Sequence, residues 1–438
     1  MVQVITIKYR RNVLFGLVGC MLAFAAQSPV VAADIKADPA LEAQFREGLD
    51  ALQEERLKTA IRAFSKILDI NPRLHRAKLE LALAYYRSLR YEDAAKLANE
   101  VLENPATPPE VRVTILAFLA QVKRDSAQYG QKNSLKPFIS AGVMHDSNVN
   151  VGPSDNIIRV GDVDLTLVPG ATAKSDNAYI VNAGVDHLYQ SGKRVEFGER
   201  TGMLVWQSGA SFYSRKYNKF HDFNLQVASV NTGPAVLMLR HWRASLQLRS
   251  DYLRLGGHEL GWFNSINPSF IWQFDNGELD WDATYTRRSY NRDIDSGREG
   301  DYFDTGLNLG HYFNNRQVIT TAGAKLIKFF ADDDQYGYLG GQVNAGINTN
   351  TWHNGSVYAR GRVSLFRYDG QDSLFSKDRY DVEYRTTVGL SHQYKDEGDL
   401  LKGWAFNVYW ERTFNDSNIG DLYSYIRNQW TASLSRGF

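Results

Sequence analysis

The stretch Tyr380 to Tyr394, YDVEYRTTVGLSHQY, decides the fold of most of this chain. Its even positions carry Tyr, Val, Tyr, Thr, Val, Leu, His and Tyr, whereas its odd positions carry Asp, Glu, Arg, Thr, Gly, Ser and Gln. Because successive side chains of a β-strand point to opposite faces, such a strand has one apolar face and one polar face. The period of two therefore predicts β structure rather than helix.

The same alternation recurs in fourteen stretches after residue 135. They lie near residues 136–145, 177–190, 202–214, 221–233, 242–253, 262–274, 278–290, 302–313, 317–330, 337–349, 355–367, 379–394, 403–414 and 426–438. Tight turns such as 275–277, 314–316 and 353–355 alternate with longer polar loops at 146–176, 291–301, 368–378 and 415–425. An even strand count with short turns on one side and long loops on the other is typical of an outer-membrane barrel. We predict an all-β transmembrane barrel of 14 antiparallel strands over residues 135–438.

Composition separates this region from the rest of the 438-residue chain. Of its 22 Phe, 24 Tyr and 9 Trp, only ten aromatic residues precede residue 135, and 31 of the 35 glycines follow it. A soluble β-sandwich also alternates, but it would have no reason for so many aromatics. A barrel needs them for its outer face and interfacial girdles, as with Tyr179 and Tyr189 or Tyr380 and Tyr394. The net charge of +1 indicates no nucleic-acid partner.

The last stretch alternates back from Phe438 to Ile426. An amphipathic last strand that ends on phenylalanine resembles the signal read by the outer-membrane assembly machinery, which we therefore expect as a partner. The lipid bilayer is the other expected partner of this region.

The first 33 residues are typical of a secretory signal peptide. A basic start with Lys8, Arg10 and Arg11 precedes an apolar core over 13–26 and a small-residue cleavage site at 31–33. Cys20, the only cysteine, would be removed with this peptide, and no disulfide is possible. In an alternative reading, residues 17–20 form a lipoprotein processing box and Cys20 carries a lipid anchor.

Residues 34–130 predict a small all-α domain with a period of 34. The small-residue, aromatic and terminal-proline positions of a tetratricopeptide repeat are occupied in the first repeat by Gly48, Ala60, Phe64 and Pro72. Adding 34 to the first three gives Ala82, Ala94 and Ala98 in the second repeat. Such repeats offer a concave groove for a peptide or protein, although two repeats could also serve only as a spacer.

Catalytic and metal chemistry have little support in the sequence. His145 and Ser147 loosely resemble an outer-membrane hydrolase neighbourhood, but residues 146–148 equally form a turn after the first strand. Asp332, Asp333 and Asp334 at a loop tip could hold calcium, although a solvated loop explains them as well. We expect no enzyme activity, cofactor or resident metal.

Charged residues on the polar faces are expected to line the barrel interior. The candidates are Arg249, Asp251, Asp280, Asp282, Arg288, Arg360, Arg362, Asp381, Glu383, Arg385 and Glu411. Their mixed signs indicate either cross-strand pairing or a polar wall past which a chain can slide. A pore selective for one charge is not indicated.

The whole chain resembles the surface lipoprotein assembly modulator (Slam) family, the type XI secretion translocators of Gram-negative bacteria. The resemblance rests on a signal peptide, helical repeats, a 14-stranded barrel and the first-strand motif KPFISAGVMHDSNVN at 136–150, especially Asp146, Ser147, Asn148 and Asn150. It implies export of a surface lipoprotein or a secreted haem- or metal-binding protein that ends in a small β-barrel domain. It also implies that repeats in the periplasm engage this cargo or its chaperones. The resemblance implies no catalytic residues.

Two other functions remain open from the sequence. Exopolysaccharide exporters also join tetratricopeptide repeats to a barrel, with more repeats and with lumen aromatics and acidic residues of one sign. An outer-membrane hydrolase would rest on His145 and Ser147 alone. We predict a protein translocator of the outer membrane with its repeat domain in the periplasm.

Overall fold

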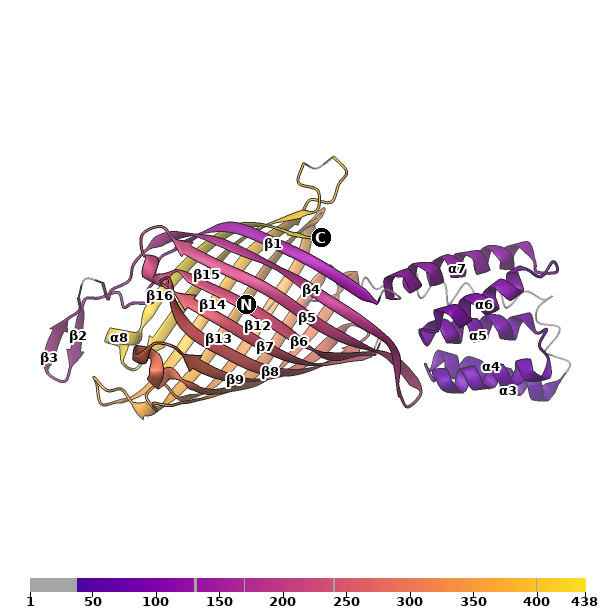
Figure 1. Ribbon diagram of the computed structural model, residues 1–438, viewed down its shortest axis with the longest axis horizontal. Helices are drawn as coiled ribbons and strands as arrows, with labels where there is room; N and C mark the ends of the chain where they lie inside the picture. Colours follow the sequence, from indigo (N-terminus) through magenta and orange to yellow (C-terminus); the bar gives the residue numbers. More distant parts are fainter. Residues whose placement is uncertain (1–37, 130–131, 169, 239–240, 399) are drawn as a thin grey trace. The chain divides into compact units, whose positions relative to one another are not determined.

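The computed structural model describes residues 38–129, 132–168, 170–238, 241–398 and 400–438. The predicted signal peptide and Cys20 lie outside the described residues, so their processing stays a prediction. The described chain consists of a helical region followed by a β-barrel (Figure 1).

The described part of the helical region contains five helices. They are α3 (Pro39–Gln53), α4 (Leu57–Ile70), α5 (His75–Arg87), α6 (Tyr91–Leu102) and α7 (Pro109–Tyr129). Asp38 caps α3 by accepting the Ala40 amide at 2.9 Å, and Pro39 occupies the first helical position, where its missing amide is not needed. α3 packs on α4 and α5 packs on α6. α4 and α6 begin one 34-residue period apart. None of the described helices is both long and apolar enough to cross a membrane.

The small residues of the period lie where helices meet. Ala60, Ala82 and Ala94 are fully buried, and a Cβ at Gly48 would lie 2.6 Å from the Phe64 ring. Gly48 therefore allows α3 to approach α4 closely. Pro72 lies in the turn after α4.

The barrel strands agree with the fourteen predicted stretches. They are β1 (Asn133–Asp146), β4 (Asp176–Phe197), β5 (Arg200–Tyr217), β6 (Leu225–Met238), β7 (Trp242–Leu255), β8 (His258–Phe274), β9 (Gly277–Tyr290), β10 (Gly300–Phe313), β11 (Val318–Ala331), β12 (Tyr338–Trp352), β13 (Gly355–Gln371), β14 (Asp378–Gln393), β15 (Trp404–Ser417) and β16 (Tyr425–Gly437). Each strand pairs with its sequence neighbour, and β1 pairs with β16 to close the barrel. The prediction of a closed antiparallel barrel is confirmed.

Closure occurs at a seam in which β1 runs antiparallel to β16. The register extends from Phe138 opposite Gly437 to Asp146 opposite Gln429. The Phe438 amide also donates to the Pro137 carbonyl at 2.9 Å. β1 is paired with β4 over its whole length, from Asn133 to Asp146.

Short elements occupy the connections. They are β2 (Ile157–Val160), β3 (Val163–Thr166), η1 (His221–Phe223), η2 (Asp293–Arg298), η3 (Asn314–Arg316) and α8 (Gly420–Tyr423). β2 and β3 form a separate hairpin in the first long loop, where no strands were predicted. We call the end of the barrel that carries this loop the loop end, and the opposite end the turn end.

Strands β4 and β5 are longer than predicted, because they continue to a turn at Gly198 and Glu199. With 22 and 18 residues they exceed the roughly 9–11 residues that a tilted strand needs to cross the hydrocarbon. The loop asymmetry also has exceptions. β7 and β8 are joined at the loop end by Gly256 and Gly257 alone, and the connection 394–403 at the turn end is long.

Side-chain burial shows which face meets the membrane. On β14 the exposed fractions of Tyr380, Tyr384 and Val388 are 57%, 45% and 42%, whereas Asp381 is 3% exposed. The apolar face thus points outward and the charged face inward, the reverse of a soluble sheet protein. A closed barrel leaves no unpaired strand edge in lipid. The chain is an outer-membrane β-barrel protein.

Candidate functional site: the barrel seam and the lumen

Asp146, the first residue of the predicted loop motif, is fully buried at the loop end of the seam. Its carboxylate accepts hydrogen bonds from Arg427 of β16, with Nη2 at 2.5 Å and Nε at 2.9 Å. The Tyr217 hydroxyl donates to it at 2.7 Å and Gln429 Nε2 at 3.0 Å. Three strands, β1, β5 and β16, therefore meet at one carboxylate. We call Asp146, Tyr217, Arg427 and Gln429 the seam clasp.

Asn148 and Asn150 fix the first loop to this end of the barrel. The buried Asn148 side chain accepts the Gly152 amide at 3.0 Å and donates to the Gly152 carbonyl at 2.8 Å. It also donates to the carbonyl of Ile426 in β16 at 3.2 Å. Asn150 accepts the Lys174 amide at 2.9 Å. The motif thus folds the loop and joins it to the last strand.

His145 and Ser147 point to different partners. His145 lies on the exposed outer face, 2.9 Å from Asn177 Oδ1, whereas the Ser147 hydroxyl accepts the Asn428 amide at 2.8 Å. Each is used in strand pairing contacts, so their geometry gives no support to a nucleophile and base pair.

The predicted lumen charges form mixed-sign groups on the inner wall. Arg249 Nε donates to Asp251 at 2.8 Å, and Arg379 Nε donates to Asp381 at 3.0 Å. Lys325 Nζ bridges Asp282 at 2.9 Å and Asp304 at 2.6 Å, on the neighbouring strands β9 and β10. Opposite charges therefore satisfy one another both within a strand and across strands, as buried or half-buried charges require.

A second group of charges spans β13, β14 and β15. Glu383 accepts from Arg362 and from Arg385 at 3.2 Å each, and Arg385 lies 3.6 Å from Glu411. Arg360 lies over the Tyr358 ring at 5.0 Å. Asp280 follows Glu278 and precedes Asp282 on the inner face of β9, where Arg243 lies 3.5 Å from Glu278.

The sequence reading missed several partners of these charges. Arg427, Lys325, Asp304 and Arg379 each lie on a polar face, so the same alternation could have found them. Their partners could not be named from the sequence, because pairing across strands joins residues such as Asp146 and Arg427 that are 281 positions apart.

An aromatic row inside the lumen was also missed. Arg288 lies over the rings of Tyr302 at 4.4 Å and Phe329 at 4.6 Å. Further ring contacts continue the row to the last loop. They join Phe329 to Tyr338, Tyr338 to Phe366 and Tyr368, and both Tyr368 and Tyr423 to Arg379. The row crosses the loop-end half of strands β9 to β14 and ends on α8.

No metal cluster was found among the described residues. Asp332, Asp333 and Asp334 lie in the turn after β11, where Asp333 accepts the Gln335 amide at 3.1 Å and its other oxygen accepts the Gln335 side chain at 2.5 Å. This arrangement is an ordinary turn stabilised by its own aspartate.

Known proteins resemble this chain at low identity. No family model matches it. The hemophilin secretion modulator of Acinetobacter baumannii is 22% identical over 421 residues, covering 90% of this chain and 78% of that protein. At this identity the relative does not assign the chain to a family.

Solved structures match 70% of this chain at low TM-scores. An anion-selective porin from Comamonas acidovorans matches at a TM-score of 0.39 with 8% identity, over 70% of this chain and 99% of the porin. A loop-deletion variant of OmpT from Vibrio cholerae matches at 0.39 with 6% identity, over 70% and 100% of the two chains. OccAB4 of Acinetobacter baumannii matches at 0.32 with 7% identity, over 70% and 99%.

Proposed function

We propose that this protein is an outer-membrane translocator that exports a protein cargo from the periplasm to the cell surface or the medium. The observation that carries the proposal is the relative with a secretion role, which aligns over 90% of the chain and so over both the helices and the barrel. A porin would need only the barrel. The relative's name refers to secretion of hemophilin, and we propose a secreted or surface-displayed haem- or metal-binding protein as cargo here.

The inner wall suits the passage of a polypeptide. Its acidic and basic groups are paired with each other, as in the Lys325 and Glu383 groups, so the wall is polar without a strong field of one sign. A sliding chain of either charge would meet neither a strong trap nor a strong barrier.

The helical region would act before the barrel does. We propose that residues 34–130 are a tetratricopeptide domain, which receives the cargo or its chaperone in the periplasm. The domain would reach the periplasm by secretion, with removal of residues 1–33. The cargo is expected to end in a β-barrel domain. The barrel itself would be inserted by the assembly machinery through the strand that ends at Phe438.

The test is deletion of the gene, with a cargo candidate encoded beside it followed by surface proteolysis and in the culture medium. We expect exposure or release of the candidate to fall, to return with the wild-type gene, and an unrelated outer-membrane protein to stay constant. Unchanged exposure and release of the candidate would overturn the proposal. Full export by H145A/S147A would remove the hydrolase alternative.

The aromatic row favours a second candidate, an exopolysaccharide exporter, because rings such as Tyr302 and Tyr338 could stack on sugars. The paired charges of both signs count against it. Loss of surface polysaccharide in the deletion strain, with cargo export unchanged, would select this alternative.

A further inference from the structure

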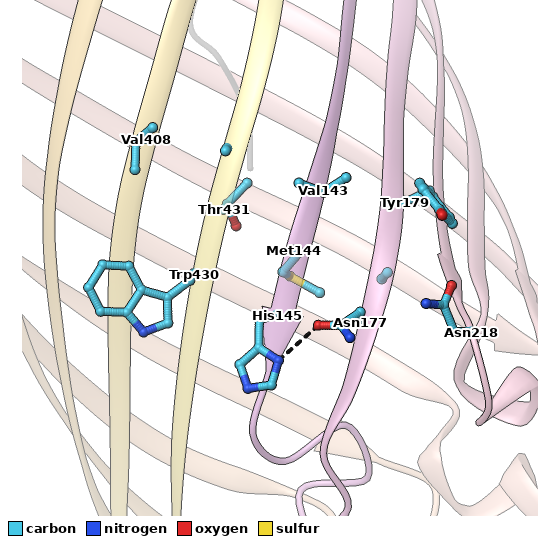
Figure 2. Close-up of a pocket in the computed structure, with 11 residues that line it drawn as sticks. Val143, Met144, His145, Asn177, Tyr179, Asn218, Val408, Trp430 and Thr431 are labelled. Carbon is cyan, nitrogen blue, oxygen red and sulfur yellow. Dashed lines mark hydrogen bonds between the residues drawn. The ribbon is translucent and has the colours of Figure 1, made fainter.

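A hollow of about 420 Å³ lies on the outer face of the seam (Figure 2). It extends across four strands, from Val408 of β15 over β16 and β1 to Tyr179 of β4. Its size is within the roughly 300–1,000 Å³ of ligand pockets. The hollow is separate from the lumen features that support export, and the inference drawn from it does not depend on the proposed function.

Side-chain size explains the hollow. Val143 of β1 and Ala432 of β16 are paired opposite each other, and both are small. The side chains that flank them are large. Trp430 and Tyr179 lie on either side of this pair and are 55% and 63% exposed. Two aromatic walls thus stand beside a low apolar floor.

One end of the hollow is polar, and two lysines lie near it in the chain. His145 and Asn177 lie there in hydrogen-bond contact, and Asn218 lies beside them (Figure 2). Lys216 and Lys219 lie two residues before and one residue after Asn218 in the chain, and both are exposed. Of the neighbouring carboxylates, Asp222 is exposed, and the other two are buried. Asp146 is bound to Arg427, and Asp176 is 4% exposed and accepts the backbone amides of Lys219 and Phe220.

The position of the hollow decides what fills it. It is on the apolar outer face, so the medium that covers it is lipid hydrocarbon. Exposed tryptophan and tyrosine rings are typical of the membrane interface, where headgroups begin. A groove that is apolar at one end and has basic residues near the other end matches a lipid with an acyl chain and a negatively charged phosphate.

We propose that the seam hollow is a binding site for one phosphate-bearing anionic membrane lipid. One acyl chain lies on Val143 and Ala432 between Trp430 and Tyr179. The phosphate lies at Lys216, Lys219 and His145. A lipid held here would cover β1 and β16 together, at the place where the barrel closes.

The acyl chain is tested by filling the hollow. The full-length protein is purified in detergent, supplied with phosphatidylglycerol, and analysed by native mass spectrometry for retained lipid. We expect wild type to retain one lipid and A432W to retain at least about fivefold less, since the new ring occupies the floor. The matched control is A345W, at an exposed alanine on the outer face of β12, with retention unchanged. Equal retention by wild type and A432W, or equal loss in A345W, would overturn the proposal.

The phosphate is tested by charge. K216Q/K219Q should lower the preference for phosphatidylglycerol over phosphatidylcholine about fivefold or more, since each basic residue near anionic headgroups contributes roughly that factor. K377Q, at an exposed lysine of the loop before β14, should leave the preference unchanged. No preference in wild type, or an unchanged one in K216Q/K219Q, would overturn the anionic headgroup. A difference in gel mobility between the unheated and the heated protein would show whether each variant is folded.

Discussion

Asp146 accepts hydrogen bonds from three side chains on two other strands, so its replacement tests the seam clasp at the scale of one residue. D146N leaves Arg427 buried without its counter-charge. We expect a loss of about 3 kcal/mol in the free energy of barrel unfolding, as for other broken buried pairs. Urea titration of the reconstituted protein measures it.

Two further variants test whether that loss comes from the interaction between Asp146 and Arg427. D146N/R427Q should lose less than the sum of the single variants, because the residues interact directly. D164N removes an exposed carboxylate paired with Arg159 in the β2–β3 hairpin, and it should leave barrel stability unchanged. A loss in D164N equal to that in D146N would contradict a specific role of the clasp.

Glu80 on α5 is a second residue whose charge has a measurable effect. It is 5% exposed, and burial raises its pKa from 4.5 to about 7, against the opposing effect of Arg76 and Arg87. The folded state therefore favours the protonated form. The stabilisation is complete below pH 4.5 and is lost as the pH rises to about 7, by on the order of 3 kcal/mol.

Hydrogen exchange of the α5 amides in the full-length protein, corrected for intrinsic rates, measures this change. Protection should fall between pH 5 and pH 7.5 in wild type and stay level in E80Q. A pH dependence in E80Q as steep as in wild type would show that another group titrates.

At the scale of elements, Gly142 tests the packing of β1 on β16. A Cβ at this position would lie 2.4 Å from the Ala432 carbonyl oxygen, so G142V forces the two strands apart. We expect a loss of about 1–3 kcal/mol in barrel stability, the usual cost of overpacking. The temperature at which heating removes the folded band from the gel measures this loss of stability.

G341V provides the matched control, because a Cβ at Gly341 of β12 meets no atom within 4 Å. A transition temperature that is the same in both variants would show that the seam has no special sensitivity to side-chain volume.

At the scale of the whole molecule, a disulfide across the seam tests whether the cargo passes through the closed lumen or through an opened seam. Ser140 and Ser435 are opposite one another, and a chain without Cys20 has no other cysteine. We expect S140C/S435C to export cargo equally well when oxidised and reduced, because a closed lumen does not require the seam to open. Export that occurs only after reduction would show lateral opening.

How much of this molecule could be predicted from sequence depends on the range of the interaction. Alternation at 380–394 is local, and it gave the strands, the outer face and the inner charges. The extensions of β4 and β5 were missed because Ser191 and Lys193 interrupt the apolar positions of β4 beyond Tyr189. The pairing of Asp146 with Arg427 is set only by closure, so no local pattern contains it.

The seam clasp has a consequence for biogenesis. Its carboxylate is supplied by the first strand, whereas Arg427 and Gln429 arrive on the last one, 281 and 283 residues later. A truncated or mis-registered barrel would leave Asp146 ionised with no cation to meet it, at a high free-energy penalty. The cluster thus makes completion of the chain a condition for stability, and incomplete products would stay open to envelope proteases.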